Sequence, residues 1–219
     1  MDIYNSVLSN AVLFKDIDSC DIPEVLQCLS SIRKTFRKGE FIFRVGDQGV
    51  PLTMLLEGKI HINTEDYWGN QTILAEIRPG QIFAETYALA PDTPLSVNAY
   101  ALTDCNVLLM NASSVLRACP KACSFHQTLI QNLAEILASK NLMLTGKLEH
   151  MAQRTTRNKL LSYLSVQSLQ TGSSTFEIPF NRQQLADYLA VDRSAMSSEL
   201  SKLQKEGLLE FNKNSFTLH

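Results

Sequence analysis

The stretch NRQQLADYLAVDRSAMSSELSKLQKEGLLEF, Asn181 to Phe211, decides how the C-terminal part of this chain folds. It holds two short amphipathic segments joined by a tight turn, and apolar residues that suit a strand follow them. Asn181 can cap the first helix, and Gln184, three residues later, can complete a capping box. Asp192 can cap the second helix, which we expect to end at Gly207. The stretch therefore predicts a helix-turn-helix.

The second predicted helix has an apolar side and a polar side. Met196, Leu200 and Leu203 share one side and should face a core. The other side can enter the major groove of DNA, which accepts one helix with its N-terminal residues at the base edges. This polar side carries Arg193, Ser194, Ser197, Ser198 and Lys202.

An ordinary helical hairpin with solvated serines is the alternative interpretation of the same pattern. The surrounding sequence favours a DNA-binding head. A helix is expected at Asn158–Gln167, a short strand TFEIP follows, and the chain closes with a hairpin around an Asn-Lys-Asn turn. Helix, strand, helix-turn-helix and hairpin in this order are more specific than a hairpin of helices alone.

Upstream, between Thr35 and Met110, the sequence pattern is typical of an antiparallel β-structure. Short β-rich pieces recur between Gly, Asp, Pro and Asn turns, namely EFIFRV, LTMLLEG, KIHINTE, QTILAEI, QIFAE, VNAYAL and CNVLLM. Short strands at regular spacing predict a sandwich or barrel-like roll. Residues 3–32 before the roll have helical spacing, so the whole chain falls in the α+β class.

Between the roll and the head, residues 121–153 predict one long helix without an internal proline. Its apolar residues fall three or four apart on two faces, one of which includes Leu129, Ile136 and Met143. The other face is a heptad-like seam made of Ile130, Leu133, Leu137, Asn141, Leu144, Leu148 and Met151. A helix buried only against its own domain is the alternative, but two apolar faces favour pairing with a second copy, where Asn141 would set the register.

The charge of the chain is distributed unevenly. Residues 1–153 hold 12 Lys and Arg against 16 Asp and Glu, whereas residues 154–219 hold 8 against 6. The predicted head is thus mildly basic, and two heads acting together would attract phosphate more strongly than one. The N-terminus has no basic leader segment and no apolar run is long enough to cross a membrane, so we expect a cytoplasmic protein without a membrane partner.

The five cysteines, Cys20, Cys28, Cys105, Cys119 and Cys123, are expected to be reduced in such a protein. Cys119 and Cys123 would form a redox pair or half of a metal site if they shared a helix face. Buried free thiols that behave as small apolar groups are the favoured interpretation. We assign no metal site.

The quoted stretch resembles the winged helix-turn-helix of the Crp/Fnr family of bacterial transcription regulators, most closely over RQQLADYLAVDRSAMSSELSKLQKEGLL. LLEGKI and RPGQIFAE in the roll extend the resemblance over nearly the whole chain. It implies a homodimer that binds palindromic promoter DNA under the control of an effector in the roll, with RNA polymerase as a further candidate partner. The expected division is an effector-sensing domain at 1–119, a dimerisation helix at 120–153 and a DNA-binding domain at 154–219. No catalytic motif is present, so we expect no enzyme.

By this resemblance, Arg182 and Gln183 would hold phosphates and Arg193 would reach a guanine edge, because its fork matches the O6 and N7 acceptors. The family commonly has a glutamate and a second arginine where Ser194 and Ser198 stand. We therefore expect a DNA site different from the usual TGTGA or TTGAT half-sites. The predicted DNA-contacting residues are Arg182, Gln183, Asp192, Arg193, Ser194, Ala195, Ser197, Ser198, Lys202 and Lys213. The alternative is a ligand-binding or signalling module with a degenerate DNA-binding head.

The effector region reads FAETYALAPDTPLSVNAYA. The family's cyclic-nucleotide binders cradle the phosphate and ribose with a Gly-Glu pair and an Arg-Ser pair. Here Glu85 is kept, but Ala84 replaces the glycine and Leu95 replaces the arginine before Ser96. A phosphate beside leucine would lose its charge-assisted partner, so cyclic AMP is not expected.

Leucine and methionine also stand near the positions where cyclic-AMP binders meet the base. Two alternatives remain, an uncharged and partly apolar effector or a collapsed pocket without ligand. We identify no cofactor. The predicted effector-pocket residues are Phe83, Ala84, Glu85, Thr86, Leu95, Ser96, Leu142 and Met143.

Overall fold

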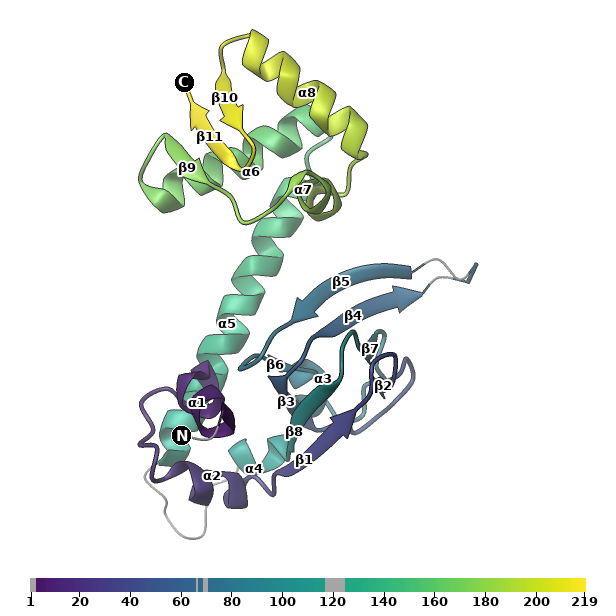
Figure 1. The fold of residues 1–219 in the computed structure, drawn as a ribbon, viewed down its shortest axis with the longest axis vertical. Helices are drawn as coiled ribbons and strands as arrows, with labels where there is room; N and C mark the ends of the chain where they lie inside the picture. The colour runs from purple at the N-terminus through teal and green to yellow at the C-terminus, as the bar shows by residue number, and fades with distance from the viewer. Residues whose placement is uncertain (1–2, 66, 69–70, 117–124) are drawn as a thin grey trace. The chain divides into compact units, whose positions relative to one another are not determined.

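The computed structural model describes residues 3–65, 67–68, 71–116 and 125–219. They belong to two compact units, residues 1–137 and residues 138–219. The long helix α5 (Phe125–Met151) contributes to both units (Figure 1). Cys119, Cys123 and the predicted domain boundary between residues 119 and 120 lie outside the described residues.

The first unit combines short helices with an antiparallel roll. Its helices besides α5 are α1 (Ile3–Asn10), the 3-10 helix η1 (Val12–Phe14), α2 (Ile22–Cys28), α3 (Glu85–Leu89) and α4 (Ala112–Leu116). Its strands are β1 (Ile32–Phe36), β2 (Phe41–Phe43), β3 (Leu52–Glu57), β4 (Ile60–Glu65), β5 (Gln71–Ile77), β6 (Ile82–Phe83), β7 (Asn98–Ala101) and β8 (Cys105–Met110). They form two antiparallel sheets, in the orders β1-β8-β3-β6 and β2-β7-β4-β5. The predicted antiparallel roll is confirmed.

Strand β3 shows how the roll is held together. Met54 and Leu56 point into a core that the N-terminal helices and α5 cover. Leu55, between them, points into a second core between the sheets. Both faces of β3 are therefore buried, which explains why its sequence is a continuous apolar run instead of an alternating one.

Strand β1 is a feature that the sequence pattern missed. The helical spacing is expected to run to Ile32, and EFIFRV, from Glu40, is the first predicted strand, but Ile32–Phe36 forms a strand that pairs with β8 at the edge of the first sheet. Only Phe36 of this strand is buried. Without an apolar alternation, nothing local distinguishes such an edge strand from a loop or a helix end.

The turn between β3 and β4 requires its glycine. Gly58 has a φ of +93°, a left-handed conformation. A Cβ at this position would collide with the backbone carbonyl of Asp104. The LEGK sequence therefore makes a tight connection that another residue would open.

Helix α5 is anchored on the first unit through its N-terminal half. Leu129 and Leu133 are buried in the core beneath the N-terminal helices, and Ile136 and Leu137 pack against it. The side-chain amide of Asn132 donates to the carbonyls of two residues around η1, at 3.0 and 2.7 Å. Leu133, which the seam prediction includes, is only 2% exposed within its own chain and belongs to this core.

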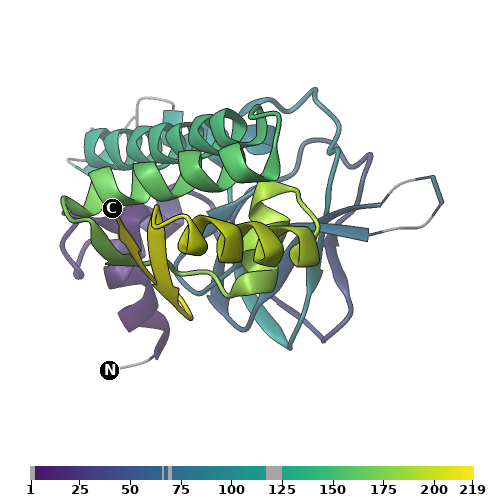
Figure 2. The ribbon, with the colours of Figure 1, turned by 90° about the horizontal axis from the view of Figure 1, so that it is seen from above.

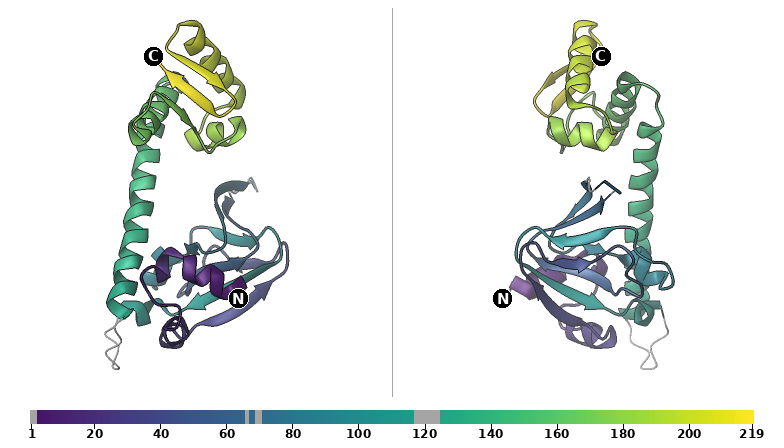
Figure 3. Two further views of the ribbon diagram at one scale, coloured as in Figure 1. Left: turned by 60° about the vertical axis from the view of Figure 1, so that its left-hand side comes forward. Right: turned by 90° about the vertical axis from the view of Figure 1, so that its right-hand side faces the viewer.

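The second unit is a three-helix head with a small sheet. Its elements after α5 are α6 (Thr156–Thr171), β9 (Thr175–Glu177), α7 (Arg182–Leu189), α8 (Arg193–Lys205), β10 (Leu209–Asn212) and β11 (Ser215–Leu218). The sheet has the order β10-β11-β9 and is antiparallel (Figure 3). Helix α8 packs against α6 (Figure 2). The predicted winged helix-turn-helix is confirmed.

The apolar sides of the head meet in one core. Its buried members are Leu160, Tyr163, Leu164, Phe176, Ile178, Leu185, Ala186, Leu189, Met196, Leu200, Leu203, Leu209 and Phe216. Helix α6 is longer than the predicted Asn158–Gln167, because Thr155 caps its start and Gly172, in the left-handed conformation, ends it. The residues SLQT thus form its last turn.

No helix within the described parts of the chain is both long and apolar enough to span a lipid bilayer.

Candidate nucleic-acid interface and effector site

The helix-turn-helix has the capping that its sequence predicts. The side chain of Asn181 accepts from the Gln184 backbone at 2.9 Å, and Gln184 Oε1 accepts from the Asn181 backbone at the same distance. Asp192 accepts from the Ala195 backbone at 2.8 Å and starts α8. Asp192 therefore serves as a helix cap, and this contact occupies one carboxylate oxygen that a direct DNA contact would use.

Helix α8 presents a small polar surface away from the core. Arg193, Ser194, Ala195 and Ser198 are exposed, and Ser197 is half-buried. They occupy the first two turns, the part of a recognition helix that meets base edges. Arg193 is the only long side chain among them.

Two other predicted contacts on the head are engaged with neighbours. The ammonium of Lys202 lies 3.2 Å from a carboxylate oxygen of Glu199. The amide of Gln183 donates to Asp187 at 2.8 Å on the exposed side of α7. Both contacts are exposed, so they are weak enough to be exchanged for a phosphate.

Arg182 differs from its expected position. Its guanidinium lies over the rings of Phe211 and Phe216 in the β10–β11 wing, 4.9 and 5.1 Å from the ring centres. Burial lowers the pKa of Arg182, and its Nη1 atom has no hydrogen-bond partner within the described residues. The side chain is thus held between α7 and the wing by cation–π contacts and is not presented to solvent as a phosphate contact would be.

The wing carries the last predicted contact. Lys213 lies in the tight turn between β10 and β11 with a φ of +50°. Its side chain is exposed. An exposed lysine at a wing tip is placed to approach a phosphate.

Helix α6 supplies two cations that the sequence analysis did not identify. Arg157 forms ion pairs with Glu206, at the end of α8, and with Glu199. The hydrogen bond with Glu206 raises the pKa of Arg157 and lowers that of the carboxylate. Lys159 donates to the backbone carbonyls of Leu189 and Ala190, at 3.2 and 3.4 Å. These partners lie at least thirty residues away in the sequence, so no short-range pattern marks them.

The last turn of α5 ends in an aromatic cluster of the second unit. His150 is buried, and its Nδ1 lies 2.8 Å from the hydroxyl of Ser162. Its ring is 5.6 Å from Tyr163 and 6.3 Å from Tyr188. Burial lowers the pKa of His150 against a smaller opposite effect of Glu149, and burial raises the pKa of both tyrosines.

The predicted effector residues of the roll lie around the start of α3. Phe83 and Leu95 are buried in the core between the sheets, and Leu95 is only 3% exposed. Ala84 has a φ of +60°, a conformation that favours the glycine of the family pattern. Glu85 is buried, whereas Thr86 is exposed.

The segment that carries Leu95 is tied to its surroundings. The hydroxyls of Ser96 and Tyr87 are 2.7 Å apart. The backbone of Leu95 pairs with the 46–47 turn in both directions, at 2.8 and 2.9 Å. A leucine thus fills the core at this position, and the serine beside it already has a partner.

Leu142 and Met143 are part of the second unit, where they are 73% and 60% exposed. In the first unit, an open hollow of about 550 Å³ is lined by Lys34, Thr35, Phe36, Gly39, Glu40, Phe41 and Arg44. None of the predicted effector residues lines it.

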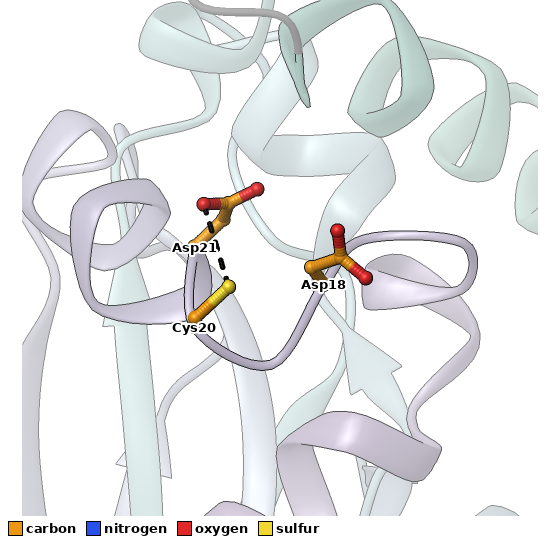
Figure 4. A group of neighbouring side chains, drawn as sticks. All are labelled: Asp18, Cys20 and Asp21. Atoms are coloured by element: carbon orange, nitrogen blue, oxygen red, sulfur yellow. Dashed lines mark hydrogen bonds between the residues drawn. The ribbon is translucent and has the colours of Figure 1, made fainter.

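A possible ligand cluster near the N-terminus consists of Asp18, Cys20 and Asp21 (Figure 4). Their candidate ligand atoms lie within 4.8 Å of one another, and the Cys20 thiol is 3.9 Å from Asp21 Oδ1. Cys20 is exposed, whereas Cys105 is buried. Exposed acidic groups of this kind are common on protein surfaces, and we assign no ion to them.

Two family models match the chain. The cyclic nucleotide-binding domain matches residues 33–121, and the Crp-like helix-turn-helix domain matches residues 158–219. The chain is 25% identical over 181 residues to the cyclic AMP receptor protein of Thermus thermophilus, which covers 81% of this chain and 79% of that protein.

Solved structures share the fold. The Thermus thermophilus catabolite activator protein superposes with a TM-score of 0.52 at 23% identity, over 95% of this chain and 94% of that one. The c-di-GMP-responsive global regulator CLP of Xanthomonas campestris gives a TM-score of 0.59 at 19% identity, over 92% and 99% of the two chains.

His150 should make the stability of the chain depend on pH. Burial holds its pKa below the ordinary value of 6.5, so the unfolded chain binds more protons than the folded one just below that value. The free energy of unfolding should be highest above about pH 6.5 and should fall as the pH drops through the window between the ordinary and the lowered pKa. Calorimetry of the full chain between about pH 5 and about pH 8 measures this, and His150→Gln should remove that part of the dependence.

The matched control is His219→Gln, which removes an exposed histidine of the same unit by the same substitution. If the free energy of unfolding fell by the same amount in the wild type and in His150→Gln over this pH range, His150 would not be the source of the pH dependence.

Proposed function

Because this chain belongs to the Crp/Fnr family of DNA-binding transcription regulators, we propose that it acts as a homodimer, reads a palindromic site with α8 and takes no cyclic AMP in its roll. We retain the division into a sensing domain, a dimerisation helix and a DNA-binding domain, and we place the protein in the cytoplasm with the DNA. No catalytic role is proposed, and RNA polymerase is a proposed further partner.

The observation that carries the DNA-reading proposal is the surface of α8. Arg193 begins the helix and is exposed, while Met196 and Leu200 on the other side are buried. A helix held in this way can enter the major groove with Arg193 foremost. The short side chains of Ser194 and Ser198 leave the groove without further long base readers, so Arg193 and the shape of the DNA would carry most of the discrimination.

Phosphate contacts would come from a smaller set than the resemblance implies. Lys213 on the wing and Gln183 at the start of α7 are exposed. Arg182 is better assigned to holding the wing against α7, since its guanidinium lies on two wing phenylalanines. Few phosphate contacts per head predict a modest salt dependence for one head, which two heads would double.

The homodimer proposal rests on the exposed apolar residues of α5. Leu144 and Leu148 are 56% and 66% exposed, and Asn141 shares their side of the helix. Ile130 and Leu137, at heptad spacing from them, are partly exposed. An apolar row of this length on one helix is a coiled-coil seam, which a second copy would cover.

A closed effector site is the proposal that the roll supports. Leu95 occupies the core where an arginine would meet a phosphate, and Tyr87 holds Ser96. Admitting a cyclic nucleotide would require a buried anion beside leucine. Of the two alternatives, the collapsed pocket is favoured over one shaped for an uncharged effector.

A second candidate function is a signalling module with a degenerate head. The observations that favour it are the pairing of Lys202 with Glu199 and the inward position of Arg182. Both reduce the positive charge available to DNA. The exposed Arg193 favours the regulator, and the following experiment separates the two.

Selection from a random DNA pool should return a palindromic site whose half-sites differ from TGTGA and TTGAT. Arg193→Ala should weaken binding of the dimer to this site by at least about thirtyfold, because one bidentate guanine contact is lost in each of the two half-sites. Fluorescence anisotropy with the full chain measures the affinity. Lys205→Ala is the matched control, since it removes an equal charge from the far end of α8 and should lower the affinity for selected and scrambled DNA alike.

Failure of the selection to enrich any sequence would favour the signalling module. Equal affinity of the wild type and Arg193→Ala for the selected site would contradict the role of Arg193.

Substitution of Leu148 by lysine should break the dimer. A lysine in the seam would bury an unpaired charge in both copies, so the dissociation constant should rise more than about tenfold. Leu142→Lys is the matched control on the same helix, because Leu142 lies off the seam and is equally exposed. Sedimentation over a range of concentrations measures the dissociation constant of the dimer. Equal dissociation constants for the two variants would refute the proposal that Leu148 lies in a dimer seam.

Cyclic AMP should give no saturable heat when it is titrated into the full chain, and it should not change the affinity for the selected DNA. The reason is the missing phosphate partner at Leu95. The Thermus thermophilus cyclic AMP receptor protein is a suitable positive control. Saturable binding at micromolar concentrations would show that the roll opens.

A further inference from the structure

Helix α6 begins with two cations that reach both helices of the helix-turn-helix. Arg157 pairs with Glu199 and Glu206 of α8. Lys159, two residues later, contacts the end of α7. One turn of α6 therefore touches α7 and α8 through separate side chains, in addition to the apolar core between them.

The contacts of Lys159 fit the chemistry of a helix end. Its ammonium donates to the Leu189 carbonyl at 3.2 Å and to the Ala190 carbonyl at 3.4 Å. These carbonyls belong to the last residue of α7 and to its C-cap. The last carbonyls of a helix have no partner within the helix and carry its partial negative charge, so a half-buried ammonium is well matched to them.

The residue after α7 is held in an unfavourable conformation. Ala190 has φ +49° and ψ +59°, in the left-handed region. Glycine adopts this region freely, whereas a side chain adds a cost there. The turn between α7 and α8 is thus strained. The Lys159 ammonium holds it through hydrogen bonds to the carbonyls of Leu189 and Ala190.

The position of this turn sets the position of the base-reading residue. Arg193 starts α8 only three residues after Ala190, with Val191 and Asp192 between them. A change in the turn angle would shift the N-terminus of α8 while its C-terminal half stays tied through Glu206 to Arg157. A small displacement at the turn therefore moves Arg193 relative to a base edge.

We propose that Lys159 is a positioning residue for DNA recognition, which fixes the α7–α8 turn and so aims Arg193 without touching DNA itself. This inference rests on the proposed DNA-reading function. A lysine that contacted phosphate would also support binding, but it would do so for every sequence, whereas a positioning residue acts on discrimination.

Binding to the selected site and to scrambled DNA separates these roles. Lys159→Met should weaken binding of the dimer to the selected site at least about thirtyfold, the scale of one misplaced base contact in each half-site, while the affinity for scrambled DNA stays unchanged. The slope of log K against log salt should also stay unchanged, because no phosphate contact is lost. Lys159→Arg, which can still donate to both carbonyls, should retain most of the discrimination.

Ala190→Gly distinguishes positioning from plain stability. Glycine removes the conformational cost, so the double variant Lys159→Met/Ala190→Gly should regain the thermal stability that Lys159→Met loses. Its discrimination should stay low, because a freer turn does not aim Arg193. Recovery of discrimination together with stability would overturn the proposal, as would a wild-type affinity of Lys159→Met for the selected site.

A fall of about 0.9 per head in the salt slope, or about 1.8 for the dimer, with equal loss on both DNAs, would assign Lys159 to phosphate contact instead. Amide hydrogen exchange provides a readout without DNA. The Val191 amide donates to the Ala186 carbonyl at 3.0 Å across the turn. Lys159→Met should speed its exchange and Lys159→Arg should not.

If the wild type preferred no DNA sequence, the proposed function would fall, and the exchange rates would still decide whether Lys159 holds the turn. If the Val191 amide exchanged at the same rate in Lys159→Met as in the wild type, the proposal that Lys159 fixes the α7–α8 turn would be refuted in that case as well.

Discussion

The apolar sides of α7 and α8 must be buried together against α6, because helices of 8 and 13 residues are marginal in water by themselves. Leu185 and Leu189 from one helix and Met196 and Leu200 from the other meet in the core of the head. This burial leaves the opposite side of α8 facing out, with Arg193 at its start. The exposed side of α8 is thus fixed by which of its residues the core of the head buries.

Helix α5 divides its apolar residues between two partners. Leu129 and Leu133 belong to the core of the first unit, whereas Leu144 and Leu148 remain exposed. The division follows from the covering elements, since the N-terminal helices reach only the first half of α5. A dimer would complete the burial of the remainder, and its two heads would then face two halves of one DNA site.

The roll shares the fold of the family, but residues in its interior differ from the family's cyclic-nucleotide-binding pattern. Ala84 has a left-handed backbone, a conformation that would suit the glycine of the family pattern better. Leu95 removes the cation and joins the core. The proposed control of the head therefore uses no anionic ligand at this position.

The sequence alone determined the antiparallel class of the roll, the order of elements in the head and the identity of the head. Capping residues such as Asn181 and Asp192, the spacing of Met196, Leu200 and Leu203, and the turn glycine Gly58 act over a few residues, so they can be read directly. The edge strand β1 could not be, because only Phe36 among its residues is buried and its pairing with β8 is remote in sequence.

Other features of the site were decided by the tertiary structure. Leu133 and Leu148 look equivalent in a heptad pattern, and only packing makes the first a core residue. Arg182 appears free in the sequence but lies on two wing phenylalanines, and Lys159 finds its carbonyls thirty residues away. Local patterns report which way a side chain points along its own helix or strand; which partner it meets depends on how distant segments pack, and that is settled only when the core forms.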